Sequence, residues 1–149
     1  MKIAILGSGG REHAIAFSIS QSKKVKKIYC IPGNAGTSEI CENVFIDINK
    51  FEEIQKFLNK NNIDLVIVGP ENPLVNGIVD YLEKYNIKTF GPNKNASQLE
   101  GSKIFTKNLC KQYNIPTANF GVFENIEDTK IFLENSQHPI VIKADNLAA

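Results

Sequence analysis

The segment at residues 2–14 reads KIAILGSGGREHA, and it contains the pattern that decides the fold. Residues 2–6 form a short apolar run that stops at Gly7, which is typical of a buried strand in a parallel sheet. Residues 10–21 have the composition of a helix. The candidates for its buried side are Ala14, Ile15, Phe17, Ser18 and Ile19. A strand that passes through a glycine turn into a helix is the basic unit of an α/β fold.

The same alternation of strand and helix continues to about residue 100. Four more apolar runs predict strands at residues 27–31, 44–48, 64–68 and 88–90. A helix is expected after Asn49 and Glu52, which have capping-box spacing, and another after Asn72 and Pro73. Because helix-length crossovers join parallel strands, we expect a Rossmann-like, doubly wound α/β sheet with helices on both faces.

The pattern changes after residue 101. Residues 102–113 and 127–135 predict helices, and residues 117–122 and 139–144 predict strands. We therefore expect a first domain at residues 1–101. Residues 102–149 are expected to be the incomplete start of a second domain, because the sequence stops directly after the last predicted strand.

Composition excludes several classes of protein. The 149 residues are 42% hydrophobic and 22% charged, as in ordinary globular domains. The net charge is only +1, so no electrostatic signature of nucleic-acid or acidic-membrane binding is present. No apolar run reaches the roughly 20 residues of a membrane-spanning helix. The three cysteines lack CxxC spacing, which favours reduced thiols and a cytoplasmic protein.

The turn at residues 7–13 resembles a phosphate-binding loop. Its glycines allow backbone amides to approach an anion, and the following helix presents its positive end. The dinucleotide pattern GxGxxG is not met, because Glu12 occupies the last glycine position, and no acidic residue ends the strand at 27–31. These departures argue against a nicotinamide dehydrogenase. Arg11, the only arginine, suits a phosphate or a surface ion pair; His13 suits a ligand or a structural role.

Two more loops follow predicted strands and are expected at the same edge of the sheet. They comprise residues 32–37, read as PGNAGT, and residues 69–74, read as GPENPL. Ligands of doubly wound folds bind at this edge, outside the carboxyl ends of the strands. Glu71 would lie at a helix N-terminus, where it could complement the helix dipole or accept hydrogen bonds from a ligand hydroxyl or amine.

Taken together, these motifs resemble the glycinamide ribonucleotide synthetases, or phosphoribosylamine–glycine ligases, a family of the ATP-grasp superfamily. Several separate motifs in the family's order carry the resemblance across essentially the whole chain. They are GGREH at 9–13, PGNAG at 32–36, VGPENPL at 68–74, FGP at 90–92, LEGSKIFTK at 99–107, IPTA at 115–118 and IVIKAD at 140–145. The implied fold is a Rossmann-like pre-ATP-grasp domain followed by the truncated start of an ATP-grasp region.

The resemblance implies a ligation in purine biosynthesis that joins glycine to 5-phosphoribosylamine and cleaves ATP to ADP and phosphate. ATP would convert the glycine carboxylate to an acyl phosphate, and the ribosylamine nitrogen would then displace the phosphate. No catalytic side chain is assigned. The residues implied for substrate binding are Gly7, Gly9, Gly10, Arg11, Glu12, His13, Pro32, Gly33, Asn34, Glu71, Asn72, Pro73 and Leu74.

For residues 102–149, the resemblance implies that Lys103 and Lys143 contact the phosphates of ATP. Without it, Lys143 would be interpreted as a lysine at a strand end that reaches solvent. Asn146 stands where the family usually has glycine. The magnesium ligands of the family lie beyond residue 149, and this chain offers no convincing metal site. We expect a monomer that binds small molecules and is inactive as an isolated chain.

Two alternatives remain open. The chain could come from another ATP-grasp carboxylate–amine ligase that shares the fold and uses a different acceptor. It could also be a non-catalytic, nucleotide-binding Rossmann module, although the missing third glycine and the missing ribose-binding acid count against this.

Overall fold

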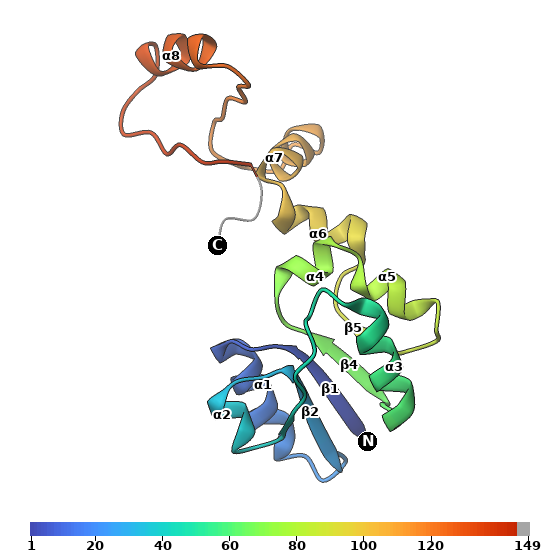
Figure 1. Cartoon of the computed structure of the whole chain (residues 1–149). Helices are drawn as coiled ribbons and strands as arrows, with labels where there is room; N and C mark the ends of the chain where they lie inside the picture. Colours follow the sequence, from blue (N-terminus) through green and yellow to red (C-terminus); the bar gives the residue numbers. More distant parts are fainter. Residues whose placement is uncertain (146–149) are drawn as a thin grey trace. The chain divides into compact units, whose positions relative to one another are not determined.

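The computed structural model describes residues 1–145, and the chain divides into two units, residues 1–97 and 98–149. The first unit contains a five-stranded, fully parallel sheet in the order β3-β2-β1-β4-β5 (Figure 1). The strands are β1 (Lys2–Gly7), β2 (Lys27–Pro32), β3 (Glu42–Asn43), β4 (Leu65–Val68) and β5 (Thr89–Phe90). The predicted α/β class and parallel sheet are therefore confirmed.

Helices connect the strands of this sheet. They are α1 (Gly10–Ser20), α2 (Ala35–Ser38), α3 (Phe51–Asn61), α4 (Glu71–Val75) and α5 (Ile78–Glu83). A further helix, α6 (Lys94–Gly101), which the sequence pattern did not reveal, follows β5. None of the helices among residues 1–145 is long and apolar enough to span a membrane.

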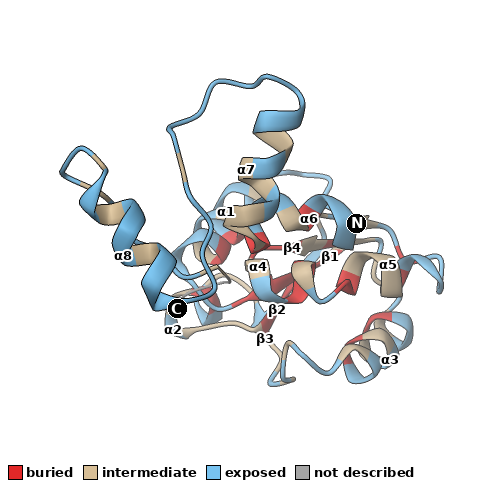
Figure 2. Cartoon of the chain, turned by 90° about the horizontal axis from the view of Figure 1, so that it is seen from above, coloured by how far each residue is buried: buried red, intermediate tan, exposed pale blue. Residues whose placement is uncertain are grey.

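Alternate residues of each central strand face opposite sides of the sheet and enter two separate cores. In β1, Ala4 and Leu6 pack with residues of α3 and α5, whereas Ile3 and Ile5 pack with Ala16 of α1. Figure 2 shows buried residues concentrated along the central strands. Burial on both faces explains why these strands are continuously apolar and why the sheet is doubly wound.

The third strand differs from its prediction. Residues 44–48 are not a strand; β3 is the two-residue segment Glu42–Asn43 just before them. Val44, Ile46 and Ile48 are nevertheless partly buried against the core, which accounts for their apolar alternation. The alternation predicted burial correctly, but the backbone hydrogen bonds to β2 end at Val44, whose amide donates to Cys30 O.

Three details of the helices also differ from their predictions. Helix α3 begins after Lys50 without a side-chain cap, and Asn49, the expected cap, donates from Nδ2 to Asp47 Oδ1. The helix expected after Asn72 is divided into α4 and α5 at Gly77, whose φ is +90°. In α1, Phe17 is 59% exposed, whereas Ala16 is fully buried. Ile15 and Ile19 are partly buried against the core, as expected, whereas Ala14 and Ser18 are exposed.

The second unit contains α7 (Lys103–Gln112), capped by the Ser102 hydroxyl, and α8 (Ile126–Glu134), capped by the Asn125 side chain. Residues 117–122 and 139–144, expected as strands, are not strands. A strand requires a neighbour that pairs with its backbone groups, and neither segment has such a partner within the described part of the chain. Val141 and Ile142 are 77% and 74% exposed.

Candidate functional site

Three turns meet at the carboxyl edge of the sheet, after β1, β2 and β4. The Gly33 amide donates to Gly7 O over 3.1 Å, and the Gly69 amide donates to Leu6 O over 3.1 Å. These bonds join the last two residues of β1 to the residues directly after β2 and β4, and they hold the turns side by side. The site predicted from three separate loops is thus one connected edge of the first unit.

Asn34 fastens the second turn to the first. Its Nδ2 donates to Ser8 O over 2.7 Å, and its Oδ1 accepts from the Thr37 amide over 2.9 Å at the start of α2. Asn43 Nδ2 donates to Asn34 O over 2.7 Å from the end of β3. A single amide side chain therefore caps a helix and also fixes the distance between two turns.

Arg11 connects the first turn to the third. Its guanidinium donates to Gly69 O and to Glu71 Oε1, each over 2.8 Å. The side chains of Arg11 and Glu71 are 56% and 32% exposed, so water screens the ion pair. The ion-pair alternative for Arg11 is therefore observed. Its main effect is geometric, because it brings a positive and a negative group to the same solvent-facing edge.

Glu12, expected to contact substrate, lies in the protein interior and is only 4% exposed. Its Oε2 accepts the Gly9 amide over 2.7 Å, as the third residue of a capped helix often does. His13 is half-buried and lies against Gly36 of α2, where a methyl group would come within 3.0 Å of the imidazole. Packing of His13 between α1 and α2 agrees with its structural interpretation.

The remaining residues of the third turn do not all face the edge. Pro73 is fully buried, and Leu74, at 7% exposure, belongs to the core formed with α3 and α5. Asn72 is exposed and donates a weak hydrogen bond to Asn49 Oδ1 over 3.4 Å. Of the predicted group at 71–74, Glu71 is the residue that joins the Arg11 cluster.

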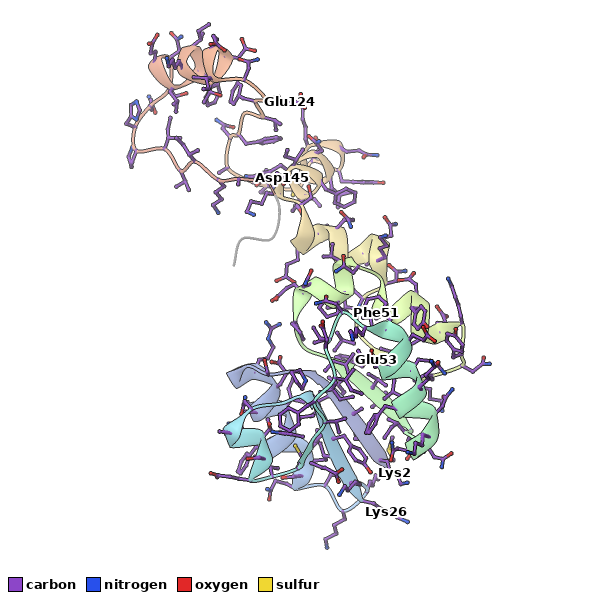
Figure 3. All side chains as sticks on the ribbon, viewed as in Figure 1. Lys2, Lys26, Phe51, Glu53, Glu124 and Asp145 are labelled. Carbon is purple, nitrogen blue, oxygen red and sulfur yellow. The ribbon has the colours of Figure 1, made fainter. Side chains whose placement is uncertain are left out.

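Lys103 and Lys143 both lie in the second unit, and Lys143 is exposed. Lys103 is the first residue of α7, where Asp145 accepts hydrogen bonds from the Ser102 hydroxyl over 2.9 Å and the Ile104 amide over 3.0 Å (Figure 3). The Ile104 amide lowers the pKa of Asp145, and Ser102 and Lys103 add to this effect. Asn146, the departure from the family pattern, lies outside the described residues.

The opposite, amino-terminal edge of the sheet carries a separate cavity of about 460 Å³. Lys26, labelled in Figure 3, and Cys41 line it, and Lys27 and Glu42 form a 2.7 Å ion pair there. Cys41 Sγ lies 3.2 Å from Cys30 Sγ, and burial raises the pKa of the Cys30 thiol to about 12. None of the residues of the three turns lines this cavity.

Within residues 1–145, no group of three or more His, Cys, Asp or Glu side chains is arranged to hold a metal ion. The described site is instead made of turn amides, one guanidinium and two carboxylates. The residue types of this edge suit an anion or a polyhydroxylated ligand.

Residues outside the predicted substrate-binding set also build the site, although Gly69 and Thr37 lie within the predicted loops. Gly69 contacts Arg11, and both Thr37 and Asn43 contact Asn34. The Asn34-x-x-Thr37 spacing is a capping-box pattern and could have revealed the Thr37 contact. Asn43 carries no comparable local signal, because its partner is nine residues away in the chain.

Comparison with known families gives two adjacent matches. Residues 1–100 match the family described as phosphoribosylglycinamide synthetase, N domain. Residues 101–149 match phosphoribosylglycinamide synthetase, ATP-grasp (A) domain.

Individual relatives agree with this result. The chain is 54% identical to the phosphoribosylamine–glycine ligase of Clostridium acetobutylicum, over all of this chain and 36% of that protein. It is 49% identical to the ligase of Caldanaerobacter subterraneus, over 99% of this chain and 36% of that one. The chain thus spans about a third of the length of these curated relatives.

Solved structures show the same similarity. The phosphoribosylamine–glycine ligase of Thermotoga maritima superposes with a TM-score of 0.76 at 32% identity, covering 99% of this chain and 34% of that one. An N5-carboxyaminoimidazole ribonucleotide synthetase from Thermus thermophilus gives 0.66 at 21% identity, covering 92% and 37%. The latter similarity shows a shared fold alone.

Proposed function

The chain belongs to the phosphoribosylglycinamide synthetase family, and we propose that it supplies the substrate-side part of a phosphoribosylamine–glycine ligase. The observation that carries this proposal is the joined edge of three turns, in which Asn34 binds the turn after β1 and Arg11 binds the turn after β4. The turn at residues 7–13 leads directly into an eleven-residue helix. This arrangement suits a ligand that combines a phosphate with hydroxyl and amine groups.

The phosphate of phosphoribosylamine would be bound by the amides at the N-terminus of α1. The first amides of a helix have no partner within the helix, and the dipole adds positive potential. The Arg11 guanidinium, more than half exposed, brings further positive charge to the same edge. Gly9 and Gly10 are exposed, whereas Gly7 is buried at the end of β1, and Pro32, Gly33 and Asn34 form the neighbouring wall.

Glu71 would face the sugar or the amine. A carboxylate accepts hydrogen bonds from hydroxyl and ammonium groups, and its ion pair with Arg11 fixes its direction. Its role would be to orient the amine for attack on an activated glycine carboxylate. Holding two reactants in a productive geometry is a major source of rate enhancement in such ligations.

For residues 102–149, we propose the start of an ATP-grasp domain that the full-length relatives extend. Lys103 and Lys143 would contact the phosphates of ATP, which serves as the co-substrate. The match to the ATP-grasp (A) domain and the exposed position of Lys143 support this assignment. ATP would supply the phosphate that activates glycine.

A chimera tests the proposal. Residues 1–149 replace the matching third of the Clostridium acetobutylicum ligase, and formation of glycinamide ribonucleotide is measured with ATP, glycine and phosphoribosylamine. We expect turnover by the chimera and none by the 149-residue chain alone. A chimera that folds but ligates a different acceptor, or none, would contradict the proposed substrate.

Two substitutions in the active chimera then test the edge itself. Arg11→Ala should raise the KM for phosphoribosylamine about tenfold or more, because a charge-assisted phosphate contact is lost. Glu71→Gln should raise the same KM, with little change in the KM for ATP. Glu83→Gln, on the exposed side of α5, is the matched control and should leave both constants unchanged.

A further inference from the structure

Glu12 is a charged residue in the interior, and the proposed contacts with substrate do not include it. It is the third residue of α1 and is 4% exposed. Its Oε2 accepts the Gly9 amide over 2.7 Å. Among the described residues, its Oε1 has no hydrogen-bond partner, and the nearest cation is Arg11 Nε at 3.8 Å. Leaving a buried carboxylate oxygen without a donor costs free energy.

The carboxylate of Glu12 fills the space between two turns. A methyl group on Gly69 would overlap Glu12 Oε1, and one on Gly7 would lie 2.6 Å from the Glu12 carboxyl carbon. A methyl group on Gly9 would lie 3.0 Å from Oε2. The side chain of Glu12 therefore takes the volume that side chains at these three positions would need.

Glu12 also accepts a hydrogen bond from one of the backbone amides at the start of α1. An α-helix leaves its first amides without partners inside the helix. Because Glu12 accepts the Gly9 amide, the Gly10 amide is the next donor of this N-terminus that can face a ligand. Meanwhile the Arg11 side chain donates to Gly69 O, so the same two turns are linked a second time.

We propose that Glu12 is a positioning residue of the anion site, rather than a residue that touches substrate. Its buried carboxylate separates the turns after β1 and β4 at a fixed distance, occupies the Gly9 amide, and directs the Gly10 amide toward the ligand phosphate. This inference rests on the proposed phosphate site and assigns a supporting role to one of its members.

The first test measures anion binding without catalysis. Inorganic phosphate is titrated into the 149-residue chain, and the amide NMR signals of Gly10 and Arg11 are followed. Glu12→Ala should weaken phosphate binding about fivefold or more, and Glu12→Gln, which keeps an acceptor for the Gly9 amide, should stay within about threefold of the parent. Glu53→Ala is the control, since Glu53 is the exposed third residue of α3.

In the chimera, Glu12→Ala should raise the KM for phosphoribosylamine about tenfold while kcat and the KM for ATP stay within about threefold. Loss of a residue with only a structural role would lower the amount of folded enzyme, without raising the KM for phosphoribosylamine selectively. If the chimera ligates nothing but phosphate binding still depends on Glu12, the proposed substrate is wrong and the positioning role stands. If phosphate binding is unchanged in Glu12→Ala, the positioning role is overturned whatever the chimera does.

A double-mutant cycle tests the spacing separately. Gly69→Ala should lower the Tm of the chain by about 5 °C, because the new methyl group collides with the Glu12 carboxylate. Gly69 does not have a positive φ, so backbone strain does not add to this effect. In the Glu12→Ala background, Gly69→Ala should lower Tm by less than about 2 °C. Equal losses in both backgrounds would refute the spacing role.

Discussion

The two units of this chain carry similar apolar patterns, yet they bury them to very different extents. In the first unit, residues of β1, β2 and β4 are almost fully buried on both faces of the sheet. Among residues 98–145, Gly101 alone is buried, and α7 and α8 have no buried residue. The difference shows that an apolar run favours burial, whereas a strand forms only when another strand pairs with its backbone.

The largest expected effect comes from truncating matched isoleucines in the two units. Ile5→Ala should lower the free energy of unfolding by about 2–5 kcal/mol, because it leaves a cavity beneath α1. Ile142→Ala, at a position 74% exposed, should change it by less than about 0.5 kcal/mol. Urea unfolding followed by circular dichroism measures both. Comparable losses at the two positions would show that the second unit has a core after all.

The next effect concerns the ionisation of a thiol in the first core. Burial raises the pKa of Cys30 from 9.0 to about 12, so between these values the unfolded chain has lost a proton that the folded chain keeps. Stability should therefore fall as pH rises above 9, by about 1.4 kcal/mol per pH unit from this group. Cys30→Ala should remove that part of the slope in alkaline urea titrations.

Cys110→Ala is the control for that experiment, since it removes a thiol from α7 in the second unit. It should leave the alkaline slope of the first unit unchanged. A slope that is the same with and without Cys30 would mean that its thiol ionises equally in the folded and unfolded chains.

Paired helix caps give a smaller effect. Asn34→Ala removes the cap of α2 together with the bond to Ser8 O, and it should destabilise the first unit by about 1–2 kcal/mol. Asn125→Ala removes the equivalent cap of α8 and should leave the first unit unaffected. Hydrogen exchange of the β1 and β2 amides distinguishes the two variants. Loss of protection in Asn125→Ala would show energetic coupling between the units.

The smallest effect should occur at the start of α7. The pKa of Asp145 is lowered chiefly by the Ile104 amide, so its stabilising contribution is present above the ordinary carboxyl pKa of 3.8 and is lost as pH falls below it. The amide signals of Lys103 and Ile104 should therefore shift and exchange faster in acid. Asp145→Asn should make these signals insensitive over the same range, whereas the amides of β1 should not respond in either protein.

The sequence was sufficient to predict the parallel sheet and the meeting of three turns, because both depend on local patterns. Apolar runs locate β1, β2 and β4, and parallel pairing brings their carboxyl ends to one edge. The burial of Glu12 could not be predicted, since a charged residue beside Arg11 favours a solvent-facing position. Its burial depends on the missing side chain of Gly69, 57 positions further along the chain.

The strands predicted at 117–122 and 139–144 failed for a related reason. Their residues have strand composition, but pairing is a property of two segments and is not encoded in either alone. Residues 44–48 illustrate the same point in the first unit. Their apolar side chains pack against the core although the segment is not a strand.

The fit of the Glu12 carboxylate against Gly69 also restricts the order in which this edge could change over evolutionary time. A larger residue at position 69 destabilises the fold less once the side chain at 12 has become shorter, since the two compete for one volume. Shortening position 12 first leaves an unoccupied space, which is the milder intermediate. The two positions should therefore be substituted as an ordered pair, with 12 changing before 69.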